Sequence, residues 1–236
     1  MKQILYLLVG IFLLASCQQE ELPDAGTNYG YLAVSGLSVA STHMDVISSR
    51  AEASEEPLTI EILKDGETVQ ILSETDLENK IKLEAGTDYA LKVYSSEYGK
   101  DTEWESNNPG VPVYYAEQSF EISTDKTTQV QVKVPMVNFG VSFQFPEEYQ
   151  GAFSSCTLNV TVGERTVALQ SGETAYFPCG TETTVFHYSL VATNIDKEEI
   201  STEENTYGDV ADETVFSGTI YAISYEMEPQ SFSVMQ

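Results

Sequence analysis

Aromatic and acidic side chains gather in one polar stretch of the chain, from Ser95 to Tyr115. The aromatic members are Tyr98, Trp104, Tyr114 and Tyr115, and the acidic members are Glu97, Asp101, Glu103 and Glu105. Aromatic rings can cover the apolar C–H faces of sugars, and carboxylates accept hydrogen bonds from hydroxyl groups. The four aromatic residues are therefore candidate ligand-binding residues for a glycan. The other interpretation is that Trp104 covers one end of a β-domain while the acids are solvated.

Carboxylate pairs in the same stretch could serve glycoside hydrolysis, which needs two carboxyl groups at a set separation across a cleft. The candidate pairs are Asp101 with Glu103 and Glu103 with Glu105. Because the chain has 37 acidic residues, such pairs arise by chance. His43 and His187 lack triad companions, and there is no G-x-S-x-G, H-E-x-x-H or phosphate-binding glycine motif. We therefore assign no catalytic residue and expect a protein that is not an enzyme.

A second acidic segment runs from Asp196 to Glu213. Oxygen-rich loops can hold Ca²⁺, which makes calcium a candidate ion, but the spacing matches no EF-hand. The favoured interpretation is a solvated run of charge between two strands. Two cysteines and two distant histidines do not favour a zinc site. We predict no metal ligands and no cofactor apart from a covalent lipid.

The chain has three cysteines, and Cys17 belongs to an N-terminal motif described below. Cys156 and Cys179 then form an even pair, which in an oxidising compartment could be joined as a disulfide. Two separate buried thiols fit the sequence equally well, because a sequence does not give the distance between them. Both alternatives stay open at this point.

Residues 1–16 have the pattern of a signal peptide. Lys2 is followed by an apolar run from Ile4 to Leu14, which is shorter than the roughly 20 residues needed to span a bilayer. The next residues, Leu14-Ala15-Ser16-Cys17, look like a lipobox, the motif of bacterial lipoprotein precursors. In that class the cysteine sulfur receives a diacylglycerol and the chain is cut just before it. Cys17 is therefore the predicted lipidation site and membrane anchor.

Residues 17–28 are predicted to be a lipidated tether, because they include Pro23, Gly26 and several polar residues. Gln18-Gln19-Glu20-Glu21 follows the cysteine and resembles the export signal of Bacteroidota lipoproteins. We therefore expect a lipid-anchored protein of the outer membrane, exposed at the cell surface.

The chain is strongly acidic, with a formal net charge of −26 that becomes −27 once Lys2 is removed with the signal peptide. Such a surface repels phosphate backbones and anionic lipid headgroups. This excludes nucleic acid as an expected partner and leaves the lipid anchor as the expected contact with the membrane. Surface proteins and glycans remain as candidate partners.

Strand patterns dominate the rest of the chain. Val130, Val132 and Val134 alternate with polar residues, and a second alternating run follows Pro135. That run is Val137, Phe139, Val141, Phe143 and Phe145. Asp65-Gly66 lies between two alternating runs and predicts a tight hairpin turn. No stretch shows a sustained helical period, so the sequence predicts an all-β protein.

About seven strands are expected on each side of Pro135, with turns at the spacing of β-sandwiches. We predict two tandem antiparallel β-sandwich domains of the immunoglobulin or transthyretin kind, behind a lipoprotein signal peptide. The predicted boundaries are 29–135 for the N-terminal β-sandwich and 136–236 for the C-terminal β-sandwich, in line with usual domain sizes.

The order of several short motifs resembles a known family. The motifs are Tyr29-Gly30-Tyr31-Leu32, Asp65-Gly66, Leu83-Glu84-Ala85-Gly86-Thr87 before Tyr89, Tyr114-Tyr115 ahead of Phe120, and Val137-Asn138-Phe139-Gly140-Val141. They are similar to Bacteroidales lipoproteins of domain-of-unknown-function family 4493. The resemblance covers most of the mature chain.

A more distant resemblance is to fimbrillin-like proteins, which pair two sandwich domains behind a lipoprotein signal. In some of them an Arg near the end of the first strand is a protease maturation site, and Arg50 stands at a comparable place. An exposed Arg in a polar loop is the favoured interpretation of Arg50.

Three functions fit these observations. The first is a cell-surface lipoprotein with a non-catalytic structural or adhesion role, such as an accessory of a fimbria-like assembly. The alternative is a glycan-binding surface lipoprotein that uses the aromatic and acidic loop around Trp104. A secreted hydrolase is the least favoured. The first leads by analogy of fold, which argues nothing about a site.

Overall fold

The computed structural model of the protein describes residues 28–39, 43–45, 57–180 and 184–225. Cys17 and Arg50 lie outside the described residues, as do the predicted signal peptide and most of the tether. The described chain consists of strands, with two single-turn helices, α1 (Glu74–Leu77) and α2 (Glu147–Gln150), and one 3₁₀ turn, η1 (Asp101–Glu103). Among these residues no helix reaches the length and hydropathy that crossing a bilayer would need.

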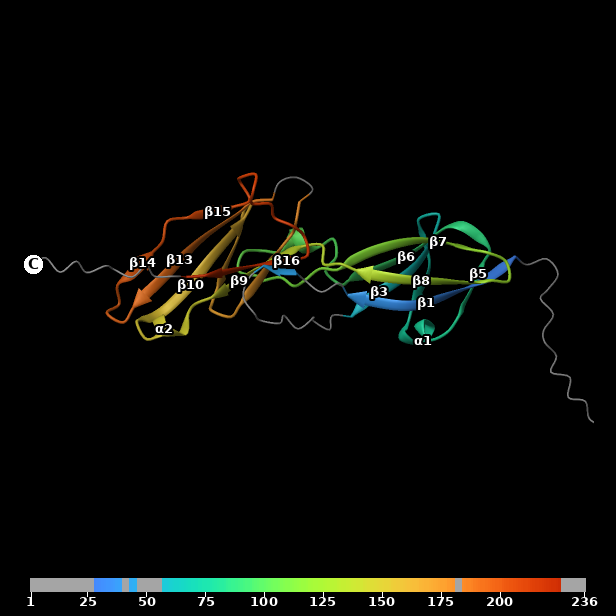
Figure 1. Ribbon diagram of the computed structural model, residues 1–236, viewed down its shortest axis with the longest axis horizontal. Helices are drawn as coiled ribbons and strands as arrows, with labels where there is room; N and C mark the ends of the chain where they lie inside the picture. Colours follow the sequence, from blue (N-terminus) through green and yellow to red (C-terminus); the bar gives the residue numbers. More distant parts are fainter. Residues whose placement is uncertain (1–27, 40–42, 46–56, 181–183, 226–236) are drawn as a thin grey trace, which may run out of the picture.

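Two sheets pack together in the first part of the chain, here named the first sandwich (Figure 1). One sheet has the order β5 (Ile81–Glu84), β1 (Tyr29–Val39), β8 (Thr127–Val134). The other has the order β4 (Glu67–Leu72), β3 (Leu58–Lys64), β6 (Gly86–Ser95), β7 (Tyr115–Ile122). Alternate side chains of both sheets point inward, as the period of two predicts. Leu32, Ile62, Leu91 and Val93 are completely buried between the sheets.

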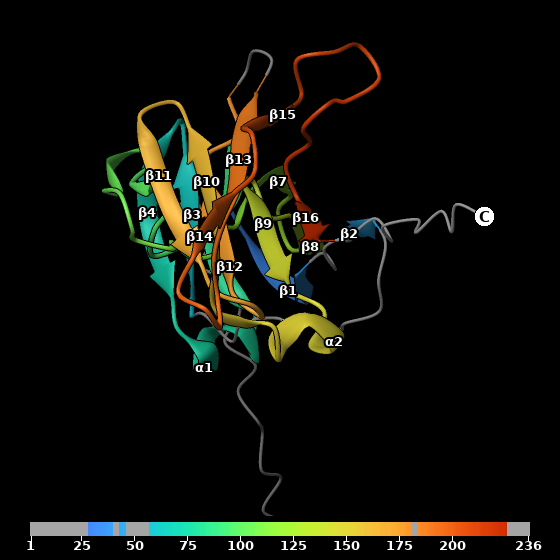
Figure 2. The same ribbon diagram turned by 90° about the vertical axis from the view of Figure 1, so that its left-hand side faces the viewer.

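Two further sheets form the second sandwich, which Figure 2 shows from its own end of the molecule. One has the order β12 (Thr174–Phe177), β9 (Phe139–Gln144), β16 (Thr219–Ser224), β2 (His43–Asp45). In the other, β11 (Arg165–Leu169), β10 (Phe153–Val162), β13 (Phe186–Asn194) and β14 (Glu199–Ser201) are neighbours, and β15 (Asn205–Tyr207) also pairs with β13. Phe139 stacks on Phe177 and Phe186 in the core between these sheets.

The all-β sandwich prediction is confirmed, but the strands are not all antiparallel. β1 runs parallel to β8, and β16 runs parallel to both β9 and β2. Parallel neighbours need a long crossover connection, and these pairs join strands that are far apart in the sequence. The antiparallel prediction followed from hairpins between consecutive strands, and it is wrong for these pairs.

β2 lies within the range predicted for the N-terminal sandwich, yet it pairs with β16 in the second sandwich. The second sandwich therefore contains one described strand that precedes β3 in the sequence. The predicted range 29–135 therefore includes one strand that pairs in the second sandwich, with a partner far away in the sequence.

Local turn chemistry agrees with the sequence. Asp65 and Gly66 both have positive φ, 55° and 82°, in the β3–β4 hairpin. The short helix α1 is capped by Ser73, whose side chain accepts from the backbone of Asp76 while the Asp76 carboxylate accepts from the backbone of Ser73.

The two sandwiches lie end to end (Figure 1). β1 starts beside the first residues of β8, and β8 ends at the passage to the second sandwich, so Tyr29 lies at the far end of the first sandwich. β9 and β16 both run away from that passage. The first described residue and Tyr225 therefore lie at opposite ends of the long axis.

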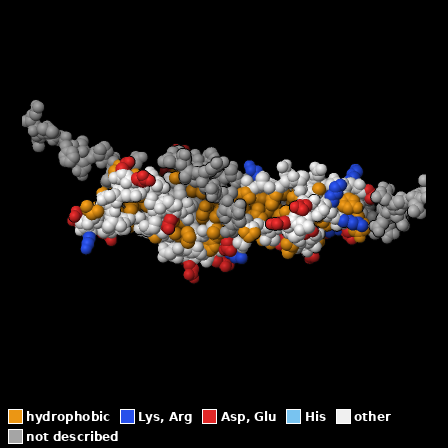
Figure 3. Space-filling model, turned by 90° about the horizontal axis from the view of Figure 1, so that it is seen from below, with side chains coloured by type: hydrophobic (Ala, Val, Ile, Leu, Met, Phe, Trp, Pro, Cys, Tyr) orange, Lys and Arg blue, Asp and Glu red, His pale blue; other side chains and the backbone are white. Residues whose placement is uncertain are grey.

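Charge is unevenly divided between the sandwiches. On the face shown in Figure 3, Lys and Arg side chains gather over the first sandwich. Among residues 137–180 and 184–225, the only Lys and Arg side chains are Arg165 and Lys197. The second sandwich therefore carries most of the unrelieved acidity of the described chain.

Candidate functional site

The four predicted aromatic residues do not form one cluster. Tyr98 and Tyr115 stack at the surface of the first sandwich, with ring centroids 4.2 Å apart and planes 9° apart. Tyr114, the next residue, is buried in the core of the first sandwich. Trp104 lies farther along the loop, against the second sandwich. The loop therefore supplies two separate surfaces rather than one site.

The stacked tyrosines belong to a polar face on the outside of the sheet β4–β3–β6–β7, here named the tyrosine face. Its centre is Glu61, a carboxylate with 8% of its surface exposed. Glu61 accepts from the Tyr94 hydroxyl at 2.6 Å and from Thr68 at 3.2 Å, and Lys92 Nζ lies 3.8 Å away. A buried carboxylate needs such partners, because an unpaired one would be costly. The tyrosine face is consequently held in one arrangement.

Hydrogen bonding to carboxylates raises the pKa of two tyrosines on this face. The Tyr94 hydroxyl donates to Glu61, and the Tyr115 hydroxyl donates to Glu117 at 2.7 Å; burial raises both pKa values further. Each folded pKa lies above the ordinary value of 10.0. The hydrogen bonds stabilise the folded state fully below pH 10. This stabilisation is lost as the pH rises through the raised pKa of each tyrosine.

We therefore expect Tyr94 and Tyr115 to ionise late in an absorbance titration of the folded protein above pH 10, together with Tyr176 and Tyr221, whose pKa values burial raises. Tyr94→Phe and Tyr115→Phe should each remove one late step. Tyr31→Phe, at an exposed position on β1, is the control and should leave both late steps in place. A late phase of unchanged size in both Tyr94→Phe and Tyr115→Phe would contradict the assignment.

Residues 96–113, here named the junction loop, run from β6 to the passage between the sandwiches. The backbone of this loop pairs with the second sandwich at three points: Asn107 N–H donates to Thr166 O at 2.8 Å, Tyr176 N–H to Pro109 O at 2.7 Å, and Val137 N–H to Val113 O at 2.8 Å. Buried backbone groups need partners, and here each sandwich supplies partners for the other.

Asn138 is the polar centre of the junction and is completely buried. Its Oδ1 accepts from Val113 N–H, and its Nδ2 donates to Val111 O, both at 2.9 Å. Its backbone carbonyl accepts from Gly218 N–H at 2.8 Å. One side chain therefore satisfies two backbone groups of the junction loop while its own backbone holds the segment before β16.

The apolar core is continuous across the junction. Ile220 of β16 is buried in the core of the first sandwich, and Tyr176 of β12 packs against the same core. Burial raises the pKa of Tyr176. Because side chains of the second sandwich complete the first core, the two sandwiches share buried surface at their junction.

Trp104 is half-buried and packs within the junction. Gly110 lies against its ring so closely that an added Cβ would be 2.6 Å from the ring atom Cε3. The guanidinium carbon of Arg165 lies 5.2 Å from the centre of the same ring and 4.6 Å from that of Phe177. Gly110 also has φ +68°, a region that side chains disfavour. Much of the Trp104 surface is thus already in contact with the protein.

Arg165, at the start of β11, joins the two sandwiches through its side chain. Nη1 donates to Tyr176 O at 2.7 Å, and Nη2 donates to Asn108 O of the junction loop. Burial lowers the pKa of Arg165, and the nearby charge of Asp101 opposes this effect. The guanidinium remains charged at neutral pH.

We expect Arg165→Ala to lower the free energy of unfolding by about 2 kcal/mol, because charged hydrogen bonds to two carbonyl groups are lost. Arg165→Lys should restore only part of this stability, since an ammonium group lacks the planar fork. Urea unfolding followed by the emission of Trp104, the single tryptophan, measures both changes. Unchanged stability in Arg165→Ala would show that the guanidinium does not hold the junction.

A cleft of about 440 Å³ opens beside these groups. The junction loop lines one side with Asp101, Trp104 and Ser106, and the second sandwich lines the other with Val162, Glu164 and Arg165. Burial raises the pKa of Asp101, and hydrogen bonds from the backbone of Asp101 and Thr102 and then the charge of Arg165 partly counteract the rise. The cleft combines carboxylates and hydroxyl groups with a half-buried aromatic ring.

Comparison with known families gives a match over almost all of the chain. The profile of a family described as a domain of unknown function, DUF4493, matches residues 28–234. The chain belongs to the DUF4493 family. The resemblance inferred from the short motifs is thereby confirmed.

Solved structures give distant likenesses to this DUF4493 chain. One, described as a "putative adhesin" of Bacteroides ovatus, is 11% identical, with 86% of this chain and 90% of that chain covered and a TM-score of 0.41. One from Bacteroides uniformis, described as a "putative cell adhesion protein", is 9% identical, with 86% and 94% covered and a TM-score of 0.45. Another B. ovatus "putative adhesin" is 10% identical, with 88% and 89% covered and a TM-score of 0.43. None of the curated proteins compared with the chain matches it.

In the structure Cys156 and Cys179 of the DUF4493 chain are separate free thiols, and each is half-buried rather than buried. Cys156 pairs with Ala192 near the end of β13, whereas Cys179 lies 3.9 Å from Thr184, just before β13 begins at Phe186. The strand from Phe186 to Ala192 is about 20 Å long. A disulfide needs Cα atoms within roughly 7 Å, which this separation does not allow.

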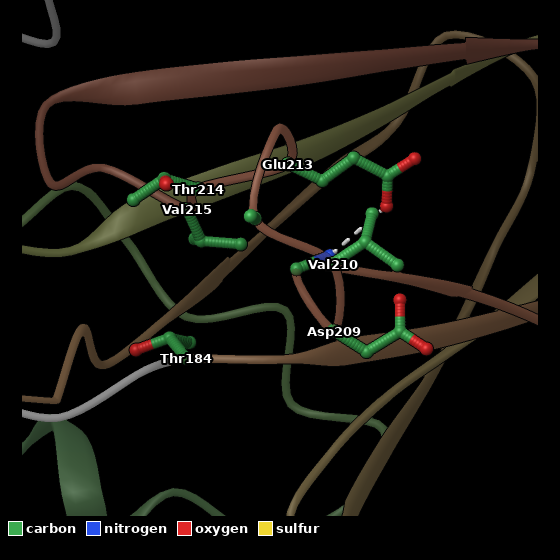
Figure 4. A pocket seen from close by; sticks show the side chains of 8 residues that line it. Thr184, Asp209, Val210, Glu213, Thr214 and Val215 are labelled. Atoms are coloured by element: carbon green, nitrogen blue, oxygen red, sulfur yellow. Dashed lines mark hydrogen bonds between the residues drawn. The ribbon is translucent and has the colours of Figure 1, made fainter.

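The acidic segment Asp196–Glu213 surrounds β14 and β15 at the surface of the second sandwich. Figure 4 shows a neighbouring pocket of about 430 Å³, where Gly208 N–H donates to the Glu213 carboxylate at 3.4 Å and Asp209 lies nearby. Across the described residues, no group of three or more His, Cys, Asp or Glu side chains is placed to hold a metal ion. Calcium therefore stays a candidate ion and not a predicted one.

Sequence reasoning missed Asn138 and Arg165. The signal for Asn138 was a polar residue between Val137 and Phe139, three residues after Pro135. Arg165 is one of two arginines in an acidic chain, which could have marked it as a partner for backbone carbonyls or aromatic rings.

Proposed function

We propose that this DUF4493 protein is a non-catalytic, lipid-anchored surface protein with a structural or adhesion role. It would hold two β-sandwiches in line and present the second away from the membrane. The observation that carries this proposal is the junction itself: hydrogen bonds from Asn138 and Arg165, three backbone pairings and a shared core join the two sandwiches. A domain interface with so many fixed contacts resists bending, as a display or spacer element requires.

The direction of the chain supports the same proposal. The described chain begins at the far end of the first sandwich, and the predicted anchor Cys17 precedes it by a short tether. An anchor at that end would leave the first sandwich nearest the membrane. The acidic second sandwich would then face outward, where repulsion from anionic headgroups does not oppose it.

A test of the anchor compares the wild-type chain with Cys17→Ser in the native bacterium. Metabolic labelling with an alkyne fatty acid should mark the wild-type protein and not the variant, and added protease should remove the wild-type protein from intact cells. Labelling of the variant, or protection of the wild-type protein in intact cells, would count against a surface lipoprotein.

A test of the structural or adhesion role is crosslinking in intact cells, followed by purification of the tagged protein on its own anchor. A discrete set of surface proteins in stoichiometric amount, or a retained host or bacterial surface glycan, would support the role. An empty purification, together with measurable turnover of a substrate that a carboxylate variant abolishes, would replace it by a hydrolase. A fimbria-like assembly is the specific case in which the co-purifying proteins are themselves polymeric.

A further inference from the structure

The cleft at the junction is the place where both sandwiches offer polar groups to the same volume. It measures about 440 Å³, within the roughly 300–1,000 Å³ range of ligand pockets, which favour domain interfaces. Trp104, Val162 and Pro178 are half-buried and form apolar walls. Phe177 lies deeper and is fully buried, with Arg165 over its ring.

The polar groups of the cleft are mostly hydrogen-bond acceptors. Asp101 and Glu105 come from the junction loop, and Glu164 comes from the turn between β10 and β11. Glu164 and Glu105 are exposed. Among the hydrogen bonds of the described chain, none is accepted by the carboxylate of either residue. Thr102 and Ser106 add hydroxyl groups. Arg165 already donates to Tyr176 O and Asn108 O, so it serves the junction more than the cleft.

This balance decides which ligand class fits. Three carboxylates against one arginine repel anions, and the net charge of −26 strengthens the repulsion. A bare metal ion is not favoured either, because the described carboxylates do not converge as a metal-binding group. A neutral polyhydroxylated ligand uses what is present: hydroxyl donors for the carboxylates and C–H faces for the apolar walls.

We propose that the junction cleft binds a neutral saccharide, with Asp101 and Glu164 accepting hydrogen bonds from its hydroxyl groups and Trp104 and Pro178 forming its apolar walls. A ligand there contacts both sandwiches at once and so stabilises the junction. The inference rests on the proposed surface role, because a surface protein meets such glycans, and it deepens that role by naming a ligand class and a site.

The experiment uses the whole mature chain on an array of immobilised neutral and acidic glycans. The neutral glycan bound most strongly is then titrated in solution while Trp104 emission is recorded, since the chain has no other tryptophan. The double variant Asp101→Asn, Glu164→Gln keeps side-chain shapes and should weaken binding at least tenfold, because two charge-assisted hydrogen bonds are weakened. Glu148→Gln, on the exposed turn α2, is the matched control and should bind as wild type.

Three outcomes would overturn the inference. They are no binding to any neutral glycan, preference for acidic glycans, and binding that the double variant retains. If the double variant still binds the glycan and Tyr98→Ala does not, the binding site is the tyrosine face. The surface role with a glycan ligand then survives. If a bound glycan is cleaved and Asp101→Asn stops cleavage, the cleft assignment stands while the non-catalytic part of the proposed function fails. Circular dichroism of each variant verifies that it is folded.

Discussion

Replacing Asn138 by alanine is expected to lower the free energy of unfolding by about 3 kcal/mol. The substitution leaves Val113 N–H and Val111 O of the junction loop without their partners. Val113 is completely buried and Val111 half-buried, and each unsatisfied backbone group costs about 1–3 kcal/mol. The measurement is urea unfolding followed by Trp104 emission and by circular dichroism together.

The matched control is Asn205→Ala, an exposed asparagine whose side chain donates to Glu203 O. That change should cost under about 0.5 kcal/mol, as is usual at the surface. Asn138→Asp keeps the acceptor but loses the donor and places a charge in a buried site, so it should cost at least as much as Asn138→Ala. A stability of Asn138→Ala equal to that of the control would mean that water or a rearranged loop replaces the side chain.

Phe139→Ala is expected to lower the free energy of unfolding by about 3–5 kcal/mol, the usual cost of deleting a buried phenylalanine ring. The ring is fully buried and has aromatic neighbours on several sides. The distances between ring centroids are 5.8 Å to Phe177, 5.9 Å to Phe186 and 6.1 Å to Tyr221. These neighbouring side chains cannot fill the cavity left by the deleted ring unless strands of both sheets move. Phe216→Ala, with 61% of the side chain exposed, is the control and should be nearly neutral.

The two substitutions together test how the sandwiches are coupled. Phe139 supports the core of the second sandwich only, whereas Asn138 supports the junction. Because Ile220 and Tyr176 of the second sandwich pack into the first core, we expect one unfolding transition in Phe139→Ala. In Asn138→Ala the transition should broaden or divide, as the sandwiches begin to unfold separately. Two well-separated transitions in the wild-type protein would contradict a rigid junction.

The proposed role and the junction variants are linked. If the protein works as a rigid display element, Asn138→Ala should reduce partner capture from intact cells even where the protein is still folded and anchored. Phe216→Ala should not. Equal capture of partners by the wild-type protein, Asn138→Ala and Phe216→Ala would show that the function needs the two sandwiches but not their fixed alignment.

Local features were determined by the sequence itself. The strands follow from alternation, since a strand with one buried face needs apolar residues at every second position; Val130, Val132 and Val134 are accordingly all buried on β8. The Asp65-Gly66 turn follows from two residues that tolerate positive φ. The inward phase of Phe139, Val141, Phe143 and Phe145 likewise needed no knowledge of their partners. Each of these depends on neighbours a few residues away.

The tertiary structure alone decided which distant segments meet. Nothing in His43–Asp45 specifies pairing with β16, and nothing in Val39 specifies that β1 runs parallel to β8. Tyr98 and Trp104 are close in sequence but face different surfaces, because the loop between them leaves one sandwich and reaches the other. Cys156 and Cys179 share a core cluster yet lie a strand length apart. Contacts between distant segments depend on the order and register of strands, which alternation constrains only to one face or the other.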